Sequence, residues 1–196
     1  MNYPNGIKKN ESDTSKNINH LNISYKNRGM TLENEINESN EYYKEINKAY
    51  IYKKPTPIKI TKVDYPSRDK AVIKEAFFTI PSTTDYNGLY REKYIDFEAK
   101  ETRSKTAFAL ENIHKHQIDH IRNIHNNSGI AFLIVRFTLL NETYLLPAKN
   151  FLKFIDMEER KSIPIDFFRK EAYIIKDGYR PIIDYLKIVD ILIGGK

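Results

Sequence analysis

The sequence predicts an α/β fold in which helices flank a mixed β-sheet. The expected elements follow one another as helix, strands with a hairpin, helix, strands and helix, the alternation typical of α/β domains. A near-continuous apolar run over residues 129–137 has the pattern of a strand that is buried on both faces. Two helical segments carry their apolar residues along one stripe. The length of 196 residues suits one domain, and 40% hydrophobic residues can fill one core.

The composition indicates in which compartment the protein works and which kinds of partner it can bind. The chain has no cysteine, which excludes disulfides and thiolate zinc sites and is ordinary in a reducing compartment. The net charge of +6, with 14 Tyr and 10 Phe, is compatible with binding to nucleic acid or to an anionic membrane. Residues 1–10 lack the apolar core of a signal peptide, and no apolar run approaches the ~20 residues that span a bilayer. We therefore expect a cytoplasmic, soluble protein.

The chain is expected to begin with a tail and a helix. Residues 1–27 are polar, rich in Asn, Lys and Ser, and without periodicity, which predicts a flexible tail ahead of a folded domain over residues 28–196. Thr31 is suited to cap a helix over Leu32–Lys48. The ordinary role of Glu33, in the first turn of this helix, is to complement the helix dipole.

A basic β-hairpin is predicted after this helix. A short strand over residues 49–52 stops at two prolines, and two extended runs follow, from Ile58 and over residues 71–80, around a turn at residues 65–69. Such a ribbon, which ends in two phenylalanines, can hold DNA phosphates, whereas the alternative is a solvated hairpin whose edges are protected by lysines. The basic residues between positions 53 and 74 are Lys53, Lys54, Lys59, Lys62, Arg68, Lys70 and Lys74.

The next segment carries the residues of chemical interest. Residues 86–88, Tyr-Asn-Gly, have the composition of a tight turn. The strand that follows alternates with period two, so that Asp96, Glu98 and Lys100 point to one face. Across the hairpin, Asp85 can lie beside these three side chains.

This pattern indicates metal-assisted hydrolysis of a phosphodiester. Two carboxylates on adjacent strands, Asp85 and Glu98, can hold a hard cation such as Mg²⁺, and Lys100 can neutralise charge that develops on the phosphate. An Asp followed, after twelve intervening residues, by Glu-x-Lys resembles the PD-(D/E)xK nuclease signature, although Thr84 stands where that signature has Pro. The alternative is a solvated strand face with ordinary surface charge.

A helix over about Ala109–His125 is predicted next, after a loop that holds Arg103 and Lys105. Gln117 lies within the apolar stripe of this helix, and a buried amide needs partners, which a carboxylate of the sheet or a metal-bound water can supply. The alternative is a core Gln satisfied by backbone groups. The histidines spread around the helix, so we interpret them as surface or phosphate-contacting groups: His114, His116, His120 and His125.

The last third of the chain completes the sheet. The buried strand over Gly129–Phe137 is expected to pair with Thr143–Leu146 as a hairpin. The remaining expected segments are a helix over residues 149–155, a charged irregular stretch over 157–169, a short strand over 173–175 and a helix from Pro181 to Ile193.

Several motifs together resemble the RecU family of Holliday-junction resolvases, from about Tyr25 to the C-terminus. Gly29 followed by Glu33 also resembles the Gly-x-x-x-Glu of the first helix of archaeal Holliday-junction resolvases. The RecU-like motifs are Asn27-Arg28-Gly29-Met30-Thr31-Leu32-Glu33, Lys53-Lys54-Pro55-Thr56-Pro57, Ala71-Val72-Ile73-Lys74-Glu75-Ala76, Ser82-Thr83-Thr84-Asp85-Tyr86-Asn87-Gly88, Ile95-Asp96-Phe97-Glu98-Ala99-Lys100-Glu101-Thr102, His116-Gln117-Ile118 and Gly178-Tyr179-Arg180-Pro181 with Ile183-Asp184-Tyr185.

The resemblance implies a restriction-endonuclease-like core of the PD-(D/E)xK type, a mixed sheet flanked by helices, with a protruding basic β-hairpin, the stalk, over about residues 62–78. It implies that residues 28–196 form a nuclease domain. The pattern of RecU also lacks the Pro of the general signature, so Thr84 is no departure from it. The residues expected to contact DNA are Lys62, Arg68, Lys70, Lys74, Phe77, Phe78, Arg103 and Lys105.

The resemblance also assigns roles at the expected metal site. Asp85 and Glu98 would be the metal carboxylates, and Thr83 and Gln117 would complete the Mg²⁺ environment. Lys100 would stabilise the transition state. The archaeal likeness adds Glu33 as an accessory residue.

The function that we expect is therefore a Mg²⁺-dependent endonuclease that resolves four-way DNA junctions by paired, symmetric nicks in recombination and repair. The family resemblance implies a homodimer that also binds and modulates RecA. The sequence has no Gly-rich phosphate loop, so no nucleotide cofactor is expected. Two alternatives stay open: a sequence-specific, restriction-type endonuclease with the same core, and a non-catalytic module that binds junctions or RecA.

Overall fold

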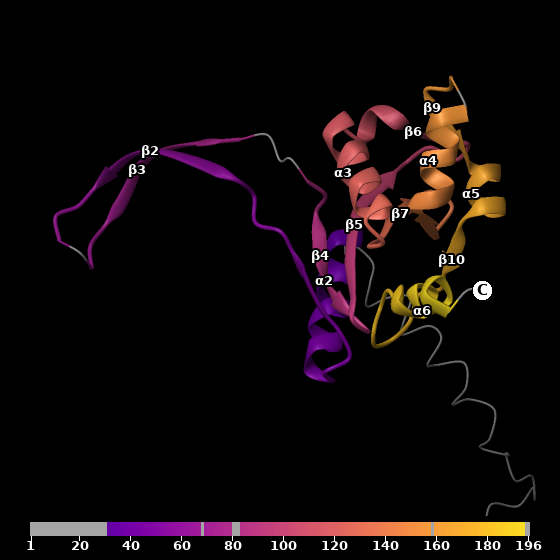
Figure 1. The fold of residues 1–196 in the computed structure, drawn as a ribbon, viewed down its shortest axis with the longest axis horizontal. Helices are drawn as coiled ribbons and strands as arrows, with labels where there is room; N and C mark the ends of the chain where they lie inside the picture. Colours follow the sequence, from indigo (N-terminus) through magenta and orange to yellow (C-terminus); the bar gives the residue numbers. More distant parts are fainter. Residues whose placement is uncertain (1–30, 68, 80–82, 158, 195–196) are drawn as a thin grey trace, which may run out of the picture. The chain divides into compact units, whose positions relative to one another are not determined.

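The computed structural model describes residues 31–67, 69–79, 83–157 and 159–194 (Figure 1). Of the two units into which the chain divides, the one over Leu32–Lys196 holds the elements described below. The predicted tail, residues 1–27, and the predicted domain boundary lie outside the described residues. Within the described part, no helix is both long enough and apolar enough to span a membrane.

The predicted mixed sheet is confirmed. Within the described residues, six strands form one sheet in the order β1-β4-β5-β7-β8-β10. The central pair β5·β7 is parallel, and every other neighbouring pair is antiparallel. The strands are β1 (Tyr50–Lys53), β4 (Tyr86–Tyr90), β5 (Lys93–Thr102), β7 (Ile130–Phe137), β8 (Glu142–Pro147) and β10 (Tyr173–Ile175).

Helices complete the α/β arrangement. Two further strands, β6 (Ala107–Ala109) and β9 (Ser162–Pro164), pair as a small separate sheet. A 3-10 turn, η1 (Leu110–Asn112), follows β6 directly. Helices α3 and α4 pack on β7, where they bury an apolar cluster that includes Leu133, Val135 and Phe151. The helices are α2 (Leu32–Glu45), α3 (Lys115–Asn126), α4 (Ala148–Met157), α5 (Ile165–Glu171) and α6 (Leu186–Gly194).

Aromatic rings fill the opposite face of the central strands. The rings of Tyr86, Phe97 and Phe132 stack in a row across β4, β5 and β7, with successive centroids 4.8 Å apart. Tyr185 packs on Phe97 at 5.1 Å, and the hydroxyl of Tyr43, from α2, donates to Asp184 Oδ1. Because β5 alternates, this packing of Phe97 fixes Asp96 and Glu98 on the other face.

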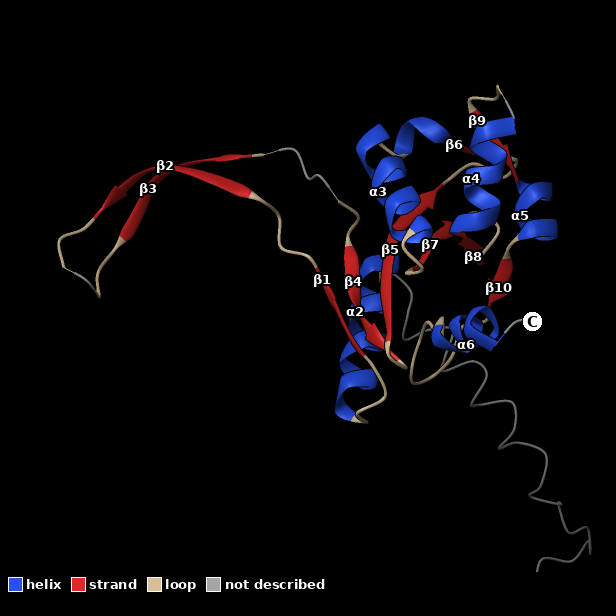
Figure 2. Cartoon of the chain, in the orientation of Figure 1, coloured by secondary structure: helices blue, strands red, loops and turns tan. Residues whose placement is uncertain are grey.

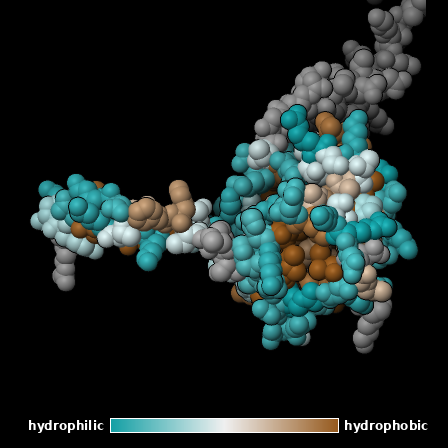
Figure 3. All heavy atoms as spheres, turned by 90° about the horizontal axis from the view of Figure 1, so that it is seen from above, coloured by the Kyte–Doolittle hydropathy of each residue, from teal (hydrophilic) through white to brown (hydrophobic). Residues whose placement is uncertain are grey.

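The predicted hairpin is present. Within the described residues, β2 (Ile58–Asp64) and β3 (Val72–Phe78) form an antiparallel sheet of their own, inserted between β1 and β4 (Figure 2). Every residue of β3 is exposed, and the surface of the hairpin is largely hydrophilic with apolar patches (Figure 3). The register shifts next to Lys62, which marks an irregularity in β2.

The predicted turn at residues 86–88 is wrong, because these residues lie inside β4. The turn falls at Arg91 and Glu92, which adopt φ angles of 46° and 61°. Gly88 serves close packing instead: a Cβ there would lie 1.9 Å from the Tyr50 carbonyl oxygen on β1. The glycine therefore marks a position with a special backbone requirement, as expected, but the requirement is the close approach of a neighbouring strand and not a turn.

Two helix boundaries also differ from expectation in this part of the chain. The first helix ends at Glu45 rather than Lys48, since Asn47 takes a left-handed φ of 52°. The helix expected from Ala109 starts at Lys115, because Ala109 is the last residue of β6, Leu110–Asn112 form the 3-10 turn η1 and Ile113 is extended.

The end of the chain holds the remaining differences. The stretch over 157–169, expected to be irregular, contains β9 and most of α5, in which Ile163, Ile165 and Phe168 are buried. The last helix starts at Leu186 rather than Pro181, because Ile183 forms an antiparallel β-bridge with Asp177 and donates its N–H to Ser39 Oγ.

Candidate metal and catalytic site

Three polar side chains of β5 lie on one face, as their spacing predicted. Asp96 and Glu98 are fully buried, and the Lys100 side chain keeps 27% of its surface exposed. Lys100 Nζ lies 2.6 Å from Glu98 Oε1 as an ion pair. The alternative of a solvated strand face is therefore wrong.

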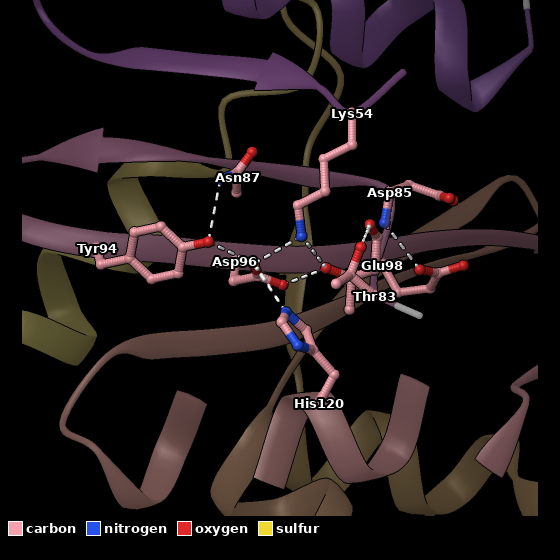
Figure 4. A network of polar contacts seen from close by, with 9 residues as sticks. Lys54, Thr83, Asp85, Asn87, Tyr94, Asp96, Glu98 and His120 are labelled. Carbon is pink, nitrogen blue, oxygen red and sulfur yellow. Dashed lines mark hydrogen bonds and ion pairs between the residues drawn. The ribbon is translucent and has the colours of Figure 1, made fainter. Parts of the chain in front are cut away.

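Asp85 joins this group from the residue before β4. Its backbone N–H donates to Glu98 Oε2 at 3.0 Å, which brings the two residues together across the β4·β5 pair. The side chains of Asp85 and Glu98 extend in the same direction, away from Asp96 (Figure 4). The structure thus brings together Asp85, Glu98 and Lys100.

The electrostatics of this group are those of a site that lacks positive charge. Burial and, second, the neighbouring charge of Asp85 raise the pKa of Glu98 from 4.5 to about 7, against the opposing effect of Lys100. Among the described residues, no donor is aligned to hydrogen-bond Glu98 Oε1, although Lys100 lies within ion-pair distance. A cation beside both carboxylates would oppose this shift, because it would stabilise the ionised form of Glu98.

The donor set fits Mg²⁺. It consists of oxygen ligands, and Mg²⁺ uses one or two carboxylates while it keeps several waters. The described residues contain no group of three or more His, Cys, Asp or Glu able to hold a metal. Two carboxylates, of which Glu98 has a buried oxygen without a hydrogen bond, suit a hard cation and do not suit a zinc site.

The other expected metal residues occupy less direct positions. Thr83 is half-buried beside Asp85, and its hydroxyl donates to the Thr84 carbonyl. Gln117 is buried, and its Oε1 accepts the His114 N–H at 3.0 Å as part of a capping box at the start of α3. This contact agrees with the alternative interpretation, in which backbone groups satisfy the buried Gln117 amide. A metal role for Thr83 and Gln117 stays a prediction.

Glu33 lies at the edge of this region. Its Oε1 pairs with Lys53 Nζ at 2.5 Å, and both side chains are about half exposed. The Tyr86 hydroxyl donates to the Glu33 carbonyl, so the helix and the site are connected through Tyr86. The accessory role of Glu33 stays a prediction.

Sequence reasoning missed the polar network around Asp96. Lys54 Nζ, the Tyr94 hydroxyl and His120 Nε2 contact Asp96 Oδ2 at 2.8, 2.9 and 3.2 Å, and the Thr84 hydroxyl donates to Oδ1 (Figure 4). The signal for His120 was available, since it lies three residues after Gln117 and so on the same side of α3. No local signal pointed to Lys54.

The residues expected to contact DNA are exposed where they are described. Lys62, Lys70 and Lys74 lie on the hairpin, with Lys74 Nζ 3.5 Å from Asp64. Phe77 and Phe78 expose 57% and 83% of their surface, which is unusual for phenylalanine. Arg103 and Lys105 are exposed after β5, and Arg68 lies outside the described residues.

Comparison with known proteins identifies the family. The family model "RecU: Recombination protein U" matches residues 27–191. The chain is 52% identical to the Holliday junction resolvase RecU of Staphylococcus carnosus, over 98% of this chain and 96% of that protein. It is 48% identical to the Holliday junction resolvase RecU of Bacillus cereus strain B4264, over 97% and 96%.

A solved structure, the Holliday junction resolvase Hjc of Archaeoglobus fulgidus, matches 50% of this chain and 75% of its own, with 10% identity and a TM-score of 0.32. That likeness is too weak to bear on fold or function. The family match covers most of the chain and includes both Asp85 and Glu98. The chain therefore belongs to the RecU family of recombination proteins.

Proposed function

We propose that this protein is a Mg²⁺-dependent endonuclease that resolves Holliday junctions in recombination and repair. The observation that carries the proposal is the convergence of Asp85, Glu98 and Lys100 in a chain about half identical to Holliday junction resolvases. A DNA substrate also agrees with the net charge of +6, and we place the protein in the cytoplasm.

The site residues would divide the chemistry between them. Asp85 and Glu98 would hold the ion through their carboxylates, both of which must be ionised. When bound, Mg²⁺ supplies a Lewis acid that polarises the scissile phosphate and lowers the pKa of a coordinated water. Lys100, paired with Glu98 and partly exposed, is placed to stabilise the negative charge that develops on the phosphate.

The reaction is an in-line hydrolysis. Water forms a bond to phosphorus as the bond to the 3′ oxygen breaks, and the departing oxygen takes a proton. The products are therefore a 5′-phosphate and a 3′-hydroxyl. Thr83 and Gln117, with Glu33 as an accessory residue, are the further candidates to orient groups around the ion.

The hairpin would supply recognition of the junction. Its lysines and exposed phenylalanines can enter the open centre of a four-way junction, where phosphate contacts give affinity without choice of sequence. Arg103 and Lys105, at the end of β5, would extend this surface toward the site. Arg68 belongs to the same predicted set.

Symmetric cleavage calls for two sites. Two nicks related by a dyad require two active sites related by the same dyad, which a C₂ homodimer provides. Light scattering at the concentration of the cleavage assay should give twice the mass of 23.1 kDa. We further propose that RecA is a partner, to be tested by the effect of the protein on the ATPase rate of RecA filaments.

The deciding experiment is cleavage of a labelled mobile junction with Mg²⁺. Wild type should give paired nicks, whereas Asp85→Asn, Glu98→Gln and Lys100→Ala should lose cleavage by at least ~10²-fold. Each variant should bind the junction as wild type does in a metal-free gel shift, since the changes affect the metal site only. Full cleavage by Asp85→Asn or Glu98→Gln would refute the assignment.

The same assay separates the alternatives. Cleavage of a linear duplex of equal sequence at a fixed motif would favour a restriction-type endonuclease. Junction binding without any product from wild type, across a range of Mg²⁺ concentrations, would favour a non-catalytic module.

A further inference from the structure

Asp96 is a buried carboxylate for which the proposed reaction has no use. It is fully buried on the same face of β5 as Glu98, two residues away. Four donors converge on its two oxygens: Lys54 Nζ, the Thr84 and Tyr94 hydroxyls, and His120 Nε2, which carries the hydrogen because a carboxylate only accepts. So complete a set of partners makes Asp96 a rigid point of the site (Figure 4).

Two of these donors come from the two connections of the hairpin. Lys54 directly follows β1, where the chain leaves for β2, and Thr84 directly precedes Asp85, where the chain has returned from β3. Lys54 Nζ also donates to Thr84 Oγ1 at 3.0 Å, and the Lys54 N–H donates to the Asp85 carbonyl at 2.7 Å. Both connections therefore meet on the Asp96 side chain.

This meeting point lies between the hairpin and the metal site. On the hairpin side, the Thr79 N–H donates to the Pro57 carbonyl at 3.1 Å and extends the β2·β3 pairing toward its base. On the other side, Asp85 is held by its N–H on Glu98 and by its carbonyl on Lys54. A displacement of Thr84 would move the adjacent Asp85.

We propose that Asp96 is a positioning residue that clamps both connections of the hairpin and thereby fixes Asp85 against Glu98. The inference rests on the proposed function, because it assigns to Asp96 the geometry of the same metal site. Asp96 acts through Lys54 and Thr84 and does not touch the substrate. Loss of its charge leaves the Lys54 ammonium without its carboxylate and frees the Thr84–Asp85 segment.

The test compares Asp96→Asn, Thr84→Val and Lys54→Met with wild type. We expect each to raise the Mg²⁺ concentration for half-maximal cleavage, and to lower kcat, by ~10- to 100-fold, the usual effect of losing a residue that orients metal ligands. The KM for the junction should stay constant, because the hairpin surface is unchanged. The rise in melting temperature that Mg²⁺ causes in wild type should shrink in the variants, a readout independent of cleavage.

The matched control is Glu35→Gln. Glu35 is also a buried carboxylate, bound to Arg136, yet it lies on α2 and contacts neither connection of the hairpin among the contacts described. This variant should lose stability and keep the wild-type Mg²⁺ dependence. In the double variant Thr84→Val with Asp96→Asn, the Mg²⁺ requirement should be no higher than in Asp96→Asn alone, since both changes break one clamp.

Two results would overturn the clamp. In one, Asp96→Asn lowers the melting temperature as Glu35→Gln does and leaves the Mg²⁺ requirement unchanged. In the other, Thr84→Val, which keeps Asp96 and tests the idea if Asp96→Asn fails to fold, cleaves at the wild-type Mg²⁺ concentration. A wild-type protein that never cleaves would instead overturn the proposed function, which keeps the two failures distinct.

Discussion

At the scale of single residues, Glu98 shows how the protein prepares a site for a cation. A carboxylate without solvent, next to a second carboxylate, is held in its ionised form only with difficulty. Lys100 offsets part of this, yet the pKa of Glu98 still rises to about 7. Such a carboxylate is stabilised more by a divalent ion than an exposed carboxylate is.

The contribution of Glu98 to the stability of the metal-free protein should fall as pH rises from about 4.5 to about 7. The unfolded chain releases the Glu98 proton near pH 4.5 and the folded protein near pH 7, so the folded state binds more protons in this window. Because Mg²⁺ binds the ionised carboxylate, the increase in melting temperature that it causes should be larger at pH 8 than at pH 6. Thermal unfolding across this range, with and without Mg²⁺, measures both trends.

Glu98→Gln is the control for this prediction, because an amide of similar shape does not titrate. In this variant, the stability should depend less on pH between about 4.5 and about 7, and Mg²⁺ should no longer raise the melting temperature at either pH. An unchanged pH dependence in this variant would mean that another group is responsible.

At the scale of elements, Gly88 determines how closely two strands approach. A Cβ at this position would lie 1.9 Å from the Tyr50 carbonyl oxygen and 2.5 Å from Ile51 Cα, both backbone atoms that cannot rotate away. β1 would therefore have to move from β4. Since Lys54 follows β1 directly, this packing also positions the Asp96 network.

Gly88→Ala should reduce the free energy of unfolding by about 1–3 kcal/mol, the range for overpacking a well-packed position. The matched control is Gly194→Ala at the end of α6, where an added Cβ would meet no atom within 4 Å. Urea denaturation of both variants measures the difference. Equal stability of Gly88→Ala and wild type would contradict the close approach of β1 and β4.

The elements also show where sequence reasoning succeeds and fails. Period two along β5 correctly predicted the shared face of Glu98 and Lys100, since alternation follows from backbone geometry alone. The start of α3 was misplaced because Leu110 and Ile113 fall at helical spacing although they lie in and directly after the 3-10 turn η1. The pairing of β6 with β9 just before this turn joins segments that are far apart in the sequence. For the same reason, contacts such as Lys54 with Asp96 cannot be predicted locally.

At the scale of the whole molecule, the hairpin presents an exposed surface on which no other described element packs. Ile58, Val72, Phe77 and Phe78 are exposed beside its lysines. A two-stranded sheet without a buried face is only marginally stable by itself. We therefore expect its apolar and basic side chains to be covered when the junction binds.

Replacing Lys70 and Lys74 together with Glu should weaken junction binding and flatten its dependence on salt. Each lost phosphate contact reduces the slope of log affinity against log salt by about one. The matched control is Lys153→Glu with Lys170→Glu, exposed lysines of α4 and α5 that make the same change in net charge. Fluorescence anisotropy at several salt concentrations, in the absence of metal, compares the two. Equal losses in both pairs would mean that net charge, and not the hairpin, governs affinity.

Because the hairpin is inserted between β1 and β4, its length can change without a change in the strands that carry the metal site. These two strands pair with each other, with Lys53 opposite Tyr86, so the sheet closes beneath the insertion whatever its length. Adding or deleting residues in matched numbers on β2 and β3 would lengthen or shorten the probe while the register of the catalytic strands stays the same. Changes in the length of the hairpin could therefore adapt the protein to branched nucleic acids of other shapes while the residues of the metal site stay in place.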